Sequence, residues 1–326
     1  MTSLYVDRRG VRLELDASAI VFYENDERVG TVPINPLSRV FIRGDVQLSA
    51  SLLGKLGEHG VGVVVLSGRQ GKPTLLMARP HNDAQRRVEQ IRRSLDSYFC
   101  LRFAQELIAE KIDTQISWFD EMRQKDMYVR YELTHAIKLL KASRLAVTSV
   151  SSLAMLRGVE GSAARAYFDG LKAVVPASLK FFSRNRRPPR DPFNALLSLT
   201  YTMVHAETSI ALFGAGLDPY VGFYHQLDFG RESLSSDLME PLRPLADEFC
   251  QRLVRRRVLT EEHFSTTDAG CFLGKAGRKH YYEAYEKHSE SLRAAVQKQV
   301  EKSLALITDA SSDGFSGDEE GGERCG

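Results

Sequence analysis

The sequence predicts an α+β protein in which a small, β-rich N-terminal domain is followed by a mostly α-helical domain. Two observations lead to this prediction. Over residues 1–78, short runs of apolar and β-branched residues are separated by turn residues, as in strands. Over residues 84–310, apolar residues instead recur every three or four positions in long segments, as in amphipathic helices. The pattern changes at Arg-Pro-His-Asn-Asp, residues 79–83, where we place a linker.

The β-rich domain is expected to contain a series of short strands and one helix. In the second strand, Val11, Leu13 and Leu15 alternate with charged residues, which is the pattern of a half-buried strand. The helix is expected over Asp45–Gly60, because its leucines follow helical spacing and a glycine ends it. The expected strands are Leu4–Val6, Val11–Leu15, Ala19–Tyr23, Arg28–Val32, Ser38–Ile42, Val61–Leu66 and Thr74–Met77.

The second domain is expected to consist of helices throughout. Glu160 should lie at a helix start, since the small residues around it leave the backbone thinly covered. In the segment from residue 234 to 259, Asp237 is expected to be the N-cap, with Pro241 in the first turn and Pro244 bending the helix. The other expected helices are Arg86–Lys111, Tyr131–Leu145 and Pro192–Phe213.

Composition limits the class of protein. The 326 residues are 43% hydrophobic and 26% charged, which excludes wholesale disorder and provides for a sizeable core. Only residues 311–326, rich in glycine and acidic residues, are expected to be a disordered acidic tail. The formal net charge is +2, so an argument for nucleic-acid binding has to rest on how the charges are distributed.

Cysteine spacing and hydropathy indicate in which cellular compartment the protein is found. Cys100, Cys250, Cys271 and Cys325 show no paired spacing, which argues against a zinc cluster and a disulfide framework. The longest apolar run, around residues 61–66, is far too short to span a bilayer. We therefore expect a cytoplasmic protein without a membrane partner.

The strongest local motif is a basic segment over residues 180–191. Arg184, Arg186, Arg187 and Arg190 fall within seven residues, and two prolines keep the chain extended between them. Such a segment suits the phosphates of a nucleic acid. A solvated charge run is an equally good interpretation of the motif by itself.

A second set of residues could hold a divalent metal ion. Glu160, His225 and Glu240 would offer the mixed nitrogen and oxygen ligands that such ions accept, with Asp237 three residues before Glu240. Each has an ordinary alternative. Glu160 could interact with a helix dipole, Asp237 could be only an N-cap, and His225 could be a hydrogen-bonded core residue. The combination of this set with the arginine segment is what favours phosphodiester chemistry, which needs charge neutralisation and a Lewis acid.

These motifs resemble the family of CRISPR-associated adaptation endonucleases, the integrases that insert new spacers into CRISPR arrays. The resemblance runs from the N-terminal β segments to about Ile307 and is most specific in three places. These are Gly158–Gly161 with Ala164 and Tyr167, Arg184–Leu197, and Gly216–Tyr220 continuing through His225 to Asp237–Glu240.

The resemblance implies a fold, a site and partners. It implies a β-sandwich-like domain at residues 1–78 that mediates homodimerisation, and a catalytic, DNA-binding domain at residues 84–310. Mg²⁺ or Mn²⁺ would be held by Glu160, His225 and Glu240, with Asp237 as a further acidic catalytic residue. Tyr167 would line the site and join the four arginines as a DNA contact. The implied partners are double-stranded DNA, both spacer precursor and CRISPR repeat, and the small scaffold protein of the adaptation complex.

The implied reaction is transesterification, in which the 3′-hydroxyl of an incoming DNA fragment attacks a phosphodiester of the repeat. Two other classes of function compete with it. A non-catalytic, structure-specific nucleic-acid-binding module would keep the arginine segment and use Glu160, His225 and Glu240 as a structural network. A metal-dependent hydrolase of small phosphoesters is disfavoured, because the basic segment is larger than one phosphate needs.

Overall fold

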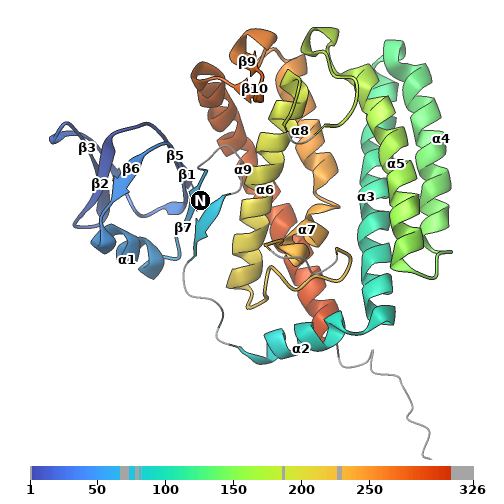
Figure 1. The fold of residues 1–326 in the computed structure, drawn as a ribbon, viewed down its shortest axis with the longest axis horizontal. Helices are drawn as coiled ribbons and strands as arrows, with labels where there is room; N and C mark the ends of the chain where they lie inside the picture. The colour runs from blue at the N-terminus through green and yellow to red at the C-terminus, as the bar shows by residue number, and fades with distance from the viewer. Residues whose placement is uncertain are drawn as a thin grey trace, which may run out of the picture.

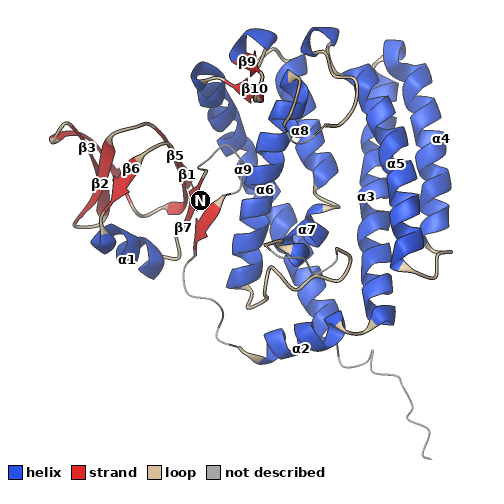
Figure 2. Cartoon of the chain, in the orientation of Figure 1, coloured by secondary structure: helices blue, strands red, loops and turns tan. Residues whose placement is uncertain are grey.

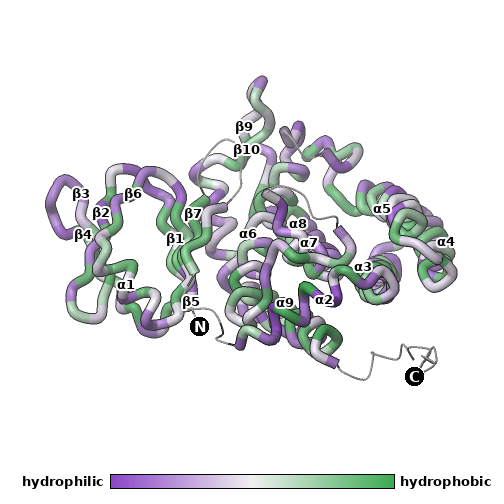
Figure 3. Tube along the Cα trace, turned by 60° about the horizontal axis from the view of Figure 1, so that its bottom comes forward, coloured by the Kyte–Doolittle hydropathy of each residue, from purple (hydrophilic) through white to green (hydrophobic). Residues whose placement is uncertain are grey.

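The computed structural model describes residues 2–66, 73–77, 81, 83–185, 188–225 and 230–309. Strands occupy the N-terminal part of the chain and helices most of the remainder, as Figures 1 and 2 show. The predicted α+β fold class is therefore confirmed. In Figure 3, hydrophobic positions recur between hydrophilic ones along both parts, which is the pattern from which the fold class was inferred.

The N-terminal domain contains two four-stranded sheets. In the first, β1, β5 and β7 run parallel and β8 pairs antiparallel with β7. In the second, β2, β3 and β4 form an antiparallel meander, and β6 pairs parallel with β2. The strands are β1 (Thr2–Asp7), β2 (Val11–Asp16), β3 (Ala19–Glu24), β4 (Glu27–Pro33), β5 (Leu37–Arg43), β6 (Val46–Leu48), β7 (Gly62–Val65) and β8 (Thr74–Leu76).

One hydrophobic cluster joins the two sheets into a sandwich. It includes Ile42 from the first sheet and Leu13 and Ile20 from the second, together with Leu52 and Leu56 of helix α1 (Ala50–Glu58). The expected strands match β1 to β5, β7 and β8. The expected helix is wrong in its first third, because that stretch forms β6 before the helix begins.

The helical domain is built from α2 to α9. Figure 1 shows α3, α4 and α5 side by side, while α6 and α9 lie between them and the β-rich domain. A short hairpin of β9 (Phe264–Thr267) and β10 (Gly270–Leu273), which the sequence analysis missed, precedes α9. The helices are α2 (Gln85–Ser94), α3 (Ser97–Lys125), α4 (Arg130–Val147), α5 (Leu153–Val174), α6 (Pro192–Gly214), α7 (Ser233–Met239), α8 (Arg243–Arg255) and α9 (Lys275–Thr308).

Two helices expected to be continuous are interrupted. The helix predicted over Arg86–Lys111 stops after α2 and restarts at α3, because the Asp96 carboxylate accepts the N–H groups of Tyr98 at 2.9 Å and Phe99 at 3.1 Å. The helix predicted over Leu234–Leu259 is divided into α7 and α8, with Pro244 in the first turn of α8. Pro244 therefore helps begin a new helix instead of bending one.

The expectation of a helix start near Glu160 is also wrong. Helix α5 begins seven residues earlier, where the Ser152 hydroxyl accepts the N–H of Met155 at 3.3 Å. Glu160 thus lies within a long helix. Its side chain has a fixed position because α5 packs against α3 and α4.

The two domains meet through a buried charge network. Glu207 of α6, only 1% exposed, accepts hydrogen bonds from Arg39 of β5 and Arg293 of α9, each at 2.9 Å. Nearby, the ring of Tyr5 stacks on that of Tyr282 with centroids 4.9 Å apart. These contacts join the first sheet to α6 and α9. Within the described residues, none of the helices is long and apolar enough to cross a membrane.

Candidate active site

The candidate site lies where α3, α5 and the end of α7 approach one another. Lys111 extends from α3, and its ammonium donates hydrogen bonds to Glu160 Oε1 at 2.5 Å and to Glu240 Oε2 at 2.7 Å. Glu160 comes from α5, and Glu240 follows the last residue of α7. Two carboxylates that are 80 residues apart in the sequence thus converge on one cation.

The two carboxylates differ in their surroundings. Glu240 is 5% exposed and also accepts a hydrogen bond at 3.0 Å from Arg243 Nε, whereas Glu160 is half-buried. Burial alone would raise the pKa of Glu240, but the charges of Arg243 and Lys111 lower it below its ordinary value. Burial likewise works against the charged form of Lys111, and the two carboxylates outweigh it and raise its pKa. Glu240 and Lys111 are therefore both stabilised in their charged forms.

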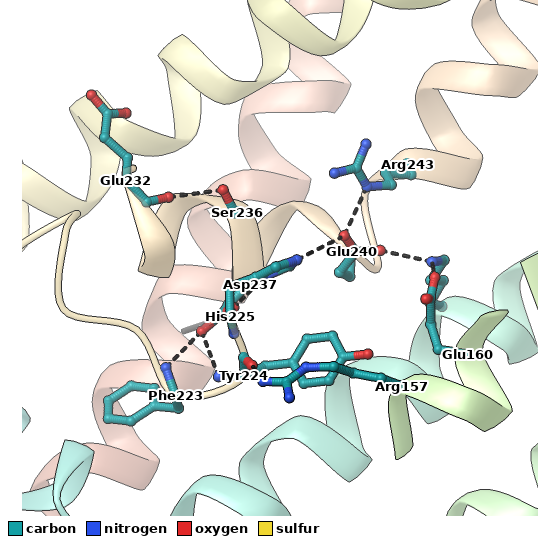
Figure 4. Close-up of polar contacts among 11 residues, drawn as sticks. Arg157, Glu160, Phe223, Tyr224, His225, Glu232, Ser236, Asp237, Glu240 and Arg243 are labelled. Atoms are coloured by element: carbon teal, nitrogen blue, oxygen red, sulfur yellow. Dashed lines mark hydrogen bonds and ion pairs between the residues drawn. The ribbon is translucent and has the colours of Figure 1, made fainter. Parts of the chain in front are cut away.

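Asp237 organises the segment before α7 (Figure 4). Its fully buried carboxylate accepts the backbone N–H groups of Phe223 at 2.7 Å, Tyr224 at 3.0 Å and His225 at 2.8 Å. The close approach requires glycine at position 222, because a Cβ there would lie 2.7 Å from Asp237 Oδ2. Asp237 lies inside α7 and is not its N-cap, so that prediction is wrong.

The same carboxylate fixes the imidazole of His225. Its Oδ1 atom lies 2.6 Å from His225 Nδ1, and because a carboxylate oxygen accepts, the Nδ1–H group donates this hydrogen bond. The opposite nitrogen, Nε2, lies 3.9 Å from Glu240 Oε1. The structure therefore brings together Glu160, His225, Asp237 and Glu240, the four residues predicted to be catalytic.

These residues fit a divalent metal by their chemistry. Two carboxylates and an imidazole are ligands that Mg²⁺ and Mn²⁺ accept. In the described part of the chain, however, no group of three or more His, Cys, Asp or Glu side chains is arranged as a metal site. The Lys111 ammonium lies between the two carboxylates instead.

Sequence reasoning missed Lys111 and Arg243. A signal for Lys111 existed, because it follows Leu107 by four residues and Ile108 by three, which places it on the buried face of α3. A lysine at such a position needs an acidic partner. Arg243 follows Glu240 by three residues, which is the spacing of a local ion pair.

Small residues leave the backbone beside Glu160 open. Gly158 and Gly161 are exposed, and a Cβ added to either would meet nothing within 4 Å. Arg157, one turn before Gly161, donates a hydrogen bond to the carbonyl of Tyr224 at 3.0 Å and so joins α5 to the His225 segment. A large ligand could therefore approach this face of α5 closely.

The arginines of the basic segment differ in their surroundings. Arg184 is held by the protein, since it donates to Asn194 Oδ1 at 2.8 Å and to Ser198 at 3.2 Å, and lies 5.3 Å from the ring centroid of Tyr201. Arg190 is exposed. Arg186 and Arg187 lie outside the described residues.

Tyr167 has no surface with which to contact DNA. Its side chain is 1% exposed, and its hydroxyl donates to Asp247 Oδ2 at 2.9 Å. Tyr201 donates to the other oxygen of the same carboxylate. Burial raises the pKa of Asp247 to about 6 despite these hydrogen bonds. The prediction of a DNA contact by Tyr167 is corrected to a structural role beneath the site.

Comparison with known proteins places this chain in a family. The family described as CRISPR associated protein Cas1 matches residues 4–287. The CRISPR-associated endonuclease Cas1 1 of Thermodesulfovibrio yellowstonii is 38% identical over 305 residues, which cover 92% of this chain and 95% of that protein. The similarity thus spans both domains.

Solved structures share the fold. A Cas1 protein from Thermotoga maritima matches with a TM-score of 0.82 at 21% identity, covering 95% of this chain and 98% of the other. A casposase bound to an integration product matches with a TM-score of 0.77 at 20% identity, covering 94% and 91%. A Cas6-RT-Cas1–Cas2 complex contains a chain that matches at 0.77 and 24% identity, covering 94% and 35%. From the family match and the relative in T. yellowstonii, the chain belongs to the Cas1 family, the endonucleases and integrases of CRISPR adaptation.

Proposed function

We propose that this Cas1 protein is a divalent-metal-dependent DNA endonuclease and integrase that inserts short foreign DNA fragments into a CRISPR array by transesterification. The observation that carries the proposal is the convergence of Glu160, Glu240 and His225 Nε2 beside an open face of α5. This ligand set would hold Mg²⁺ or Mn²⁺.

The bond changes define what the site has to do. The 3′-hydroxyl oxygen of the incoming fragment forms a bond to a phosphorus of the repeat, and the bond from that phosphorus to a bridging oxygen breaks. The attacking hydroxyl releases its proton to solvent, and the leaving oxygen takes one up. A bound divalent ion supplies the Lewis acid that such a phosphodiester exchange needs. Water in place of the hydroxyl would give the endonuclease reaction.

The protein's own residues prepare the site. Asp237 fixes the ring orientation and the tautomer of His225, so that Nε2 is ready to act as a ligand before DNA arrives. Arg243, stacked 4.9 Å from the ring centroid of Tyr201, holds Glu240 from the other side. Preorganised groups of this kind cost no rearrangement during the reaction.

DNA binding is assigned mainly to charge outside the site. Arg190, with Arg186 and Arg187 of the same segment, would contact backbone phosphates and fix the DNA without reading bases. The substrates would be a double-stranded spacer precursor and the CRISPR repeat. Joining both ends of a fragment requires two active sites a fixed distance apart, which favours a homodimer formed through the β-rich domain. A small scaffold protein of the adaptation complex would hold two such dimers.

The test is strand transfer of a short duplex into a plasmid that carries a repeat, with the scaffold protein present. Wild type should give joined product only with Mg²⁺ or Mn²⁺. His225→Ala should reduce the product at least about a hundredfold while DNA binding persists, because one metal ligand is lost. His59→Ala, at an exposed histidine after α1, is the matched control and should retain full activity.

The alternative of a non-catalytic DNA-binding module makes the opposite prediction. It expects wild type to bind DNA and to join nothing in any divalent metal. In that case Lys111, Glu160 and Glu240 would form only a structural ion-pair network.

A further inference from the structure

Lys111 occupies the place where a metal held by both carboxylates would be expected. Its Nζ lies 2.5 Å from Glu160 Oε1 and 2.7 Å from Glu240 Oε2, and the residue is 6% exposed. These distances are those of charge-assisted hydrogen bonds. A metal ion sharing the same two oxygens would have to lie where the ammonium now lies.

Two cations already balance the formal charges of Glu160 and Glu240. Glu160 and Glu240 carry two negative charges, while Lys111 and Arg243 carry two positive ones. A divalent ion added to this cluster would face two nearby cations in a largely buried setting, where repulsion between like charges is strong. One of the two cations therefore has to move away.

Lys111 is the cation that can move. The guanidinium of Arg243 is stacked on Tyr201 as well as bound to Glu240, so its plane is held on two sides. Within the described residues, the Lys111 ammonium donates its hydrogen bonds to these two carboxylates. Its flexible four-carbon stem is the part that would turn the ammonium aside.

We propose that Lys111 is a built-in counter-cation that holds Glu160 and Glu240 together in the metal-free protein and competes with the divalent ion for them. The proposal rests on the proposed metal-dependent function. It assigns Lys111 a role in setting metal affinity: the carboxylates stay paired and hydrogen-bonded until the ion displaces the ammonium. Lys111 would then lower the affinity for the ion while keeping the two carboxylates in position for it.

The experiment measures Mn²⁺ binding to the full-length protein without DNA, by electron paramagnetic resonance titration at constant neutral pH and ionic strength. Lys111→Met should bind Mn²⁺ at least about tenfold more tightly than wild type, because the competing charge is gone. Its melting temperature in a metal chelator should be lower than that of wild type, and Mn²⁺ should raise it by more. Lys141→Met, which removes an exposed lysine of α4, is the control for net charge and should bind as wild type does.

Lys111→Gln provides a second test if the methionine variant does not fold, because its amide can still donate hydrogen bonds while carrying no charge. It should also bind Mn²⁺ more tightly than wild type. Equal or weaker binding by the folded variants would overturn the role of Lys111 while leaving the metal site in place. Absence of Mn²⁺ binding by wild type and variants alike would overturn the proposed metal site, and the role of Lys111 with it.

Discussion

At the scale of single residues, Asp237 acts mainly through the backbone that it holds. Four hydrogen bonds converge on its carboxylate, three from consecutive N–H groups and one from the His225 ring. The sequence indicated an acidic residue near the site but not this role, because the partners lie in a segment with no regular secondary structure. Spacing within one helix could not reveal it.

Replacing Asp237 by Asn should therefore affect both stability and activity. The amide would present N–H hydrogens toward backbone donors and lose the charge, so the free energy of unfolding should fall by about 2–4 kcal/mol. Strand transfer should fall at least about tenfold, because His225 is no longer held in one orientation. Urea denaturation and the plasmid assay measure the two effects.

Ser236→Ala is the matched control for this variant. Ser236 lies next to Asp237 on α7, and its hydroxyl donates to the backbone carbonyl of Glu232, at 2.9 Å. Ser236→Ala should lower the free energy of unfolding by under about 1 kcal/mol and leave strand transfer unchanged. Equal losses of stability and of strand transfer in the two variants would show that α7 is sensitive to any substitution and that Asp237 has no special role.

At the scale of elements, the sequence predicted the type of a secondary-structure element, strand or helix, better than it predicted where the element begins and ends. Alternation and helical spacing identified most strands and helices, because burial on one face imposes those periods. The missed strands were β6, three residues long, and those of the β9–β10 hairpin, four residues each. Such short runs are too brief to show a period. The interruption at Asp96 was readable as an N-cap, yet the apolar stripe continued across it.

We expect the basic segment to contain arginines with two different roles, binding DNA and stabilising the fold, which composition cannot distinguish. Arg190→Ala should weaken binding to duplex DNA and lower the slope of log affinity against log salt by about 1, because one phosphate contact is lost. Arg184→Ala should instead lower the free energy of unfolding by about 1–3 kcal/mol, because its hydrogen bonds to Asn194 and Ser198 are removed.

Salt-dependent fluorescence anisotropy and urea denaturation distinguish the two variants. Arg130→Ala, at an exposed arginine at the start of α4, is a control for the loss of one positive charge and should leave the salt slope unchanged. If Arg190→Ala matched this control in the salt titration, the segment would be a solvated charge run and not a DNA contact.

At the scale of the whole molecule, the β-rich domain is docked on the helical domain through charge as well as apolar contact. Glu207 is the centre of this interface, since it accepts from arginines of both domains. The sequence offered no sign of it, because β5, α6 and α9 are far apart along the chain. The assignment of dimerisation to the β-rich domain stays a prediction.

Glu207→Gln should lower the free energy of unfolding by about 2–4 kcal/mol, because two half-buried arginines lose the buried carboxylate that they share. Thermal and urea denaturation measure this. Glu121→Gln removes one partner of an exposed ion pair with Lys125 and should leave the free energy of unfolding nearly unchanged. A loss no larger than that of this control would mean that the domain interface does not depend on Glu207.

The central claim is that Glu160, His225 and Glu240 support metal-dependent transesterification by a DNA 3′-hydroxyl. The measurement that tests it most directly compares fragments ending in a 3′-hydroxyl with fragments ending in a dideoxynucleotide, in the plasmid assay with scaffold protein and with Mn²⁺ or a chelator. We predict joined product only for the 3′-hydroxyl fragment and only with the metal. Joined product in the chelator, or none for either fragment when DNA is bound and Mn²⁺ is present, would contradict the account.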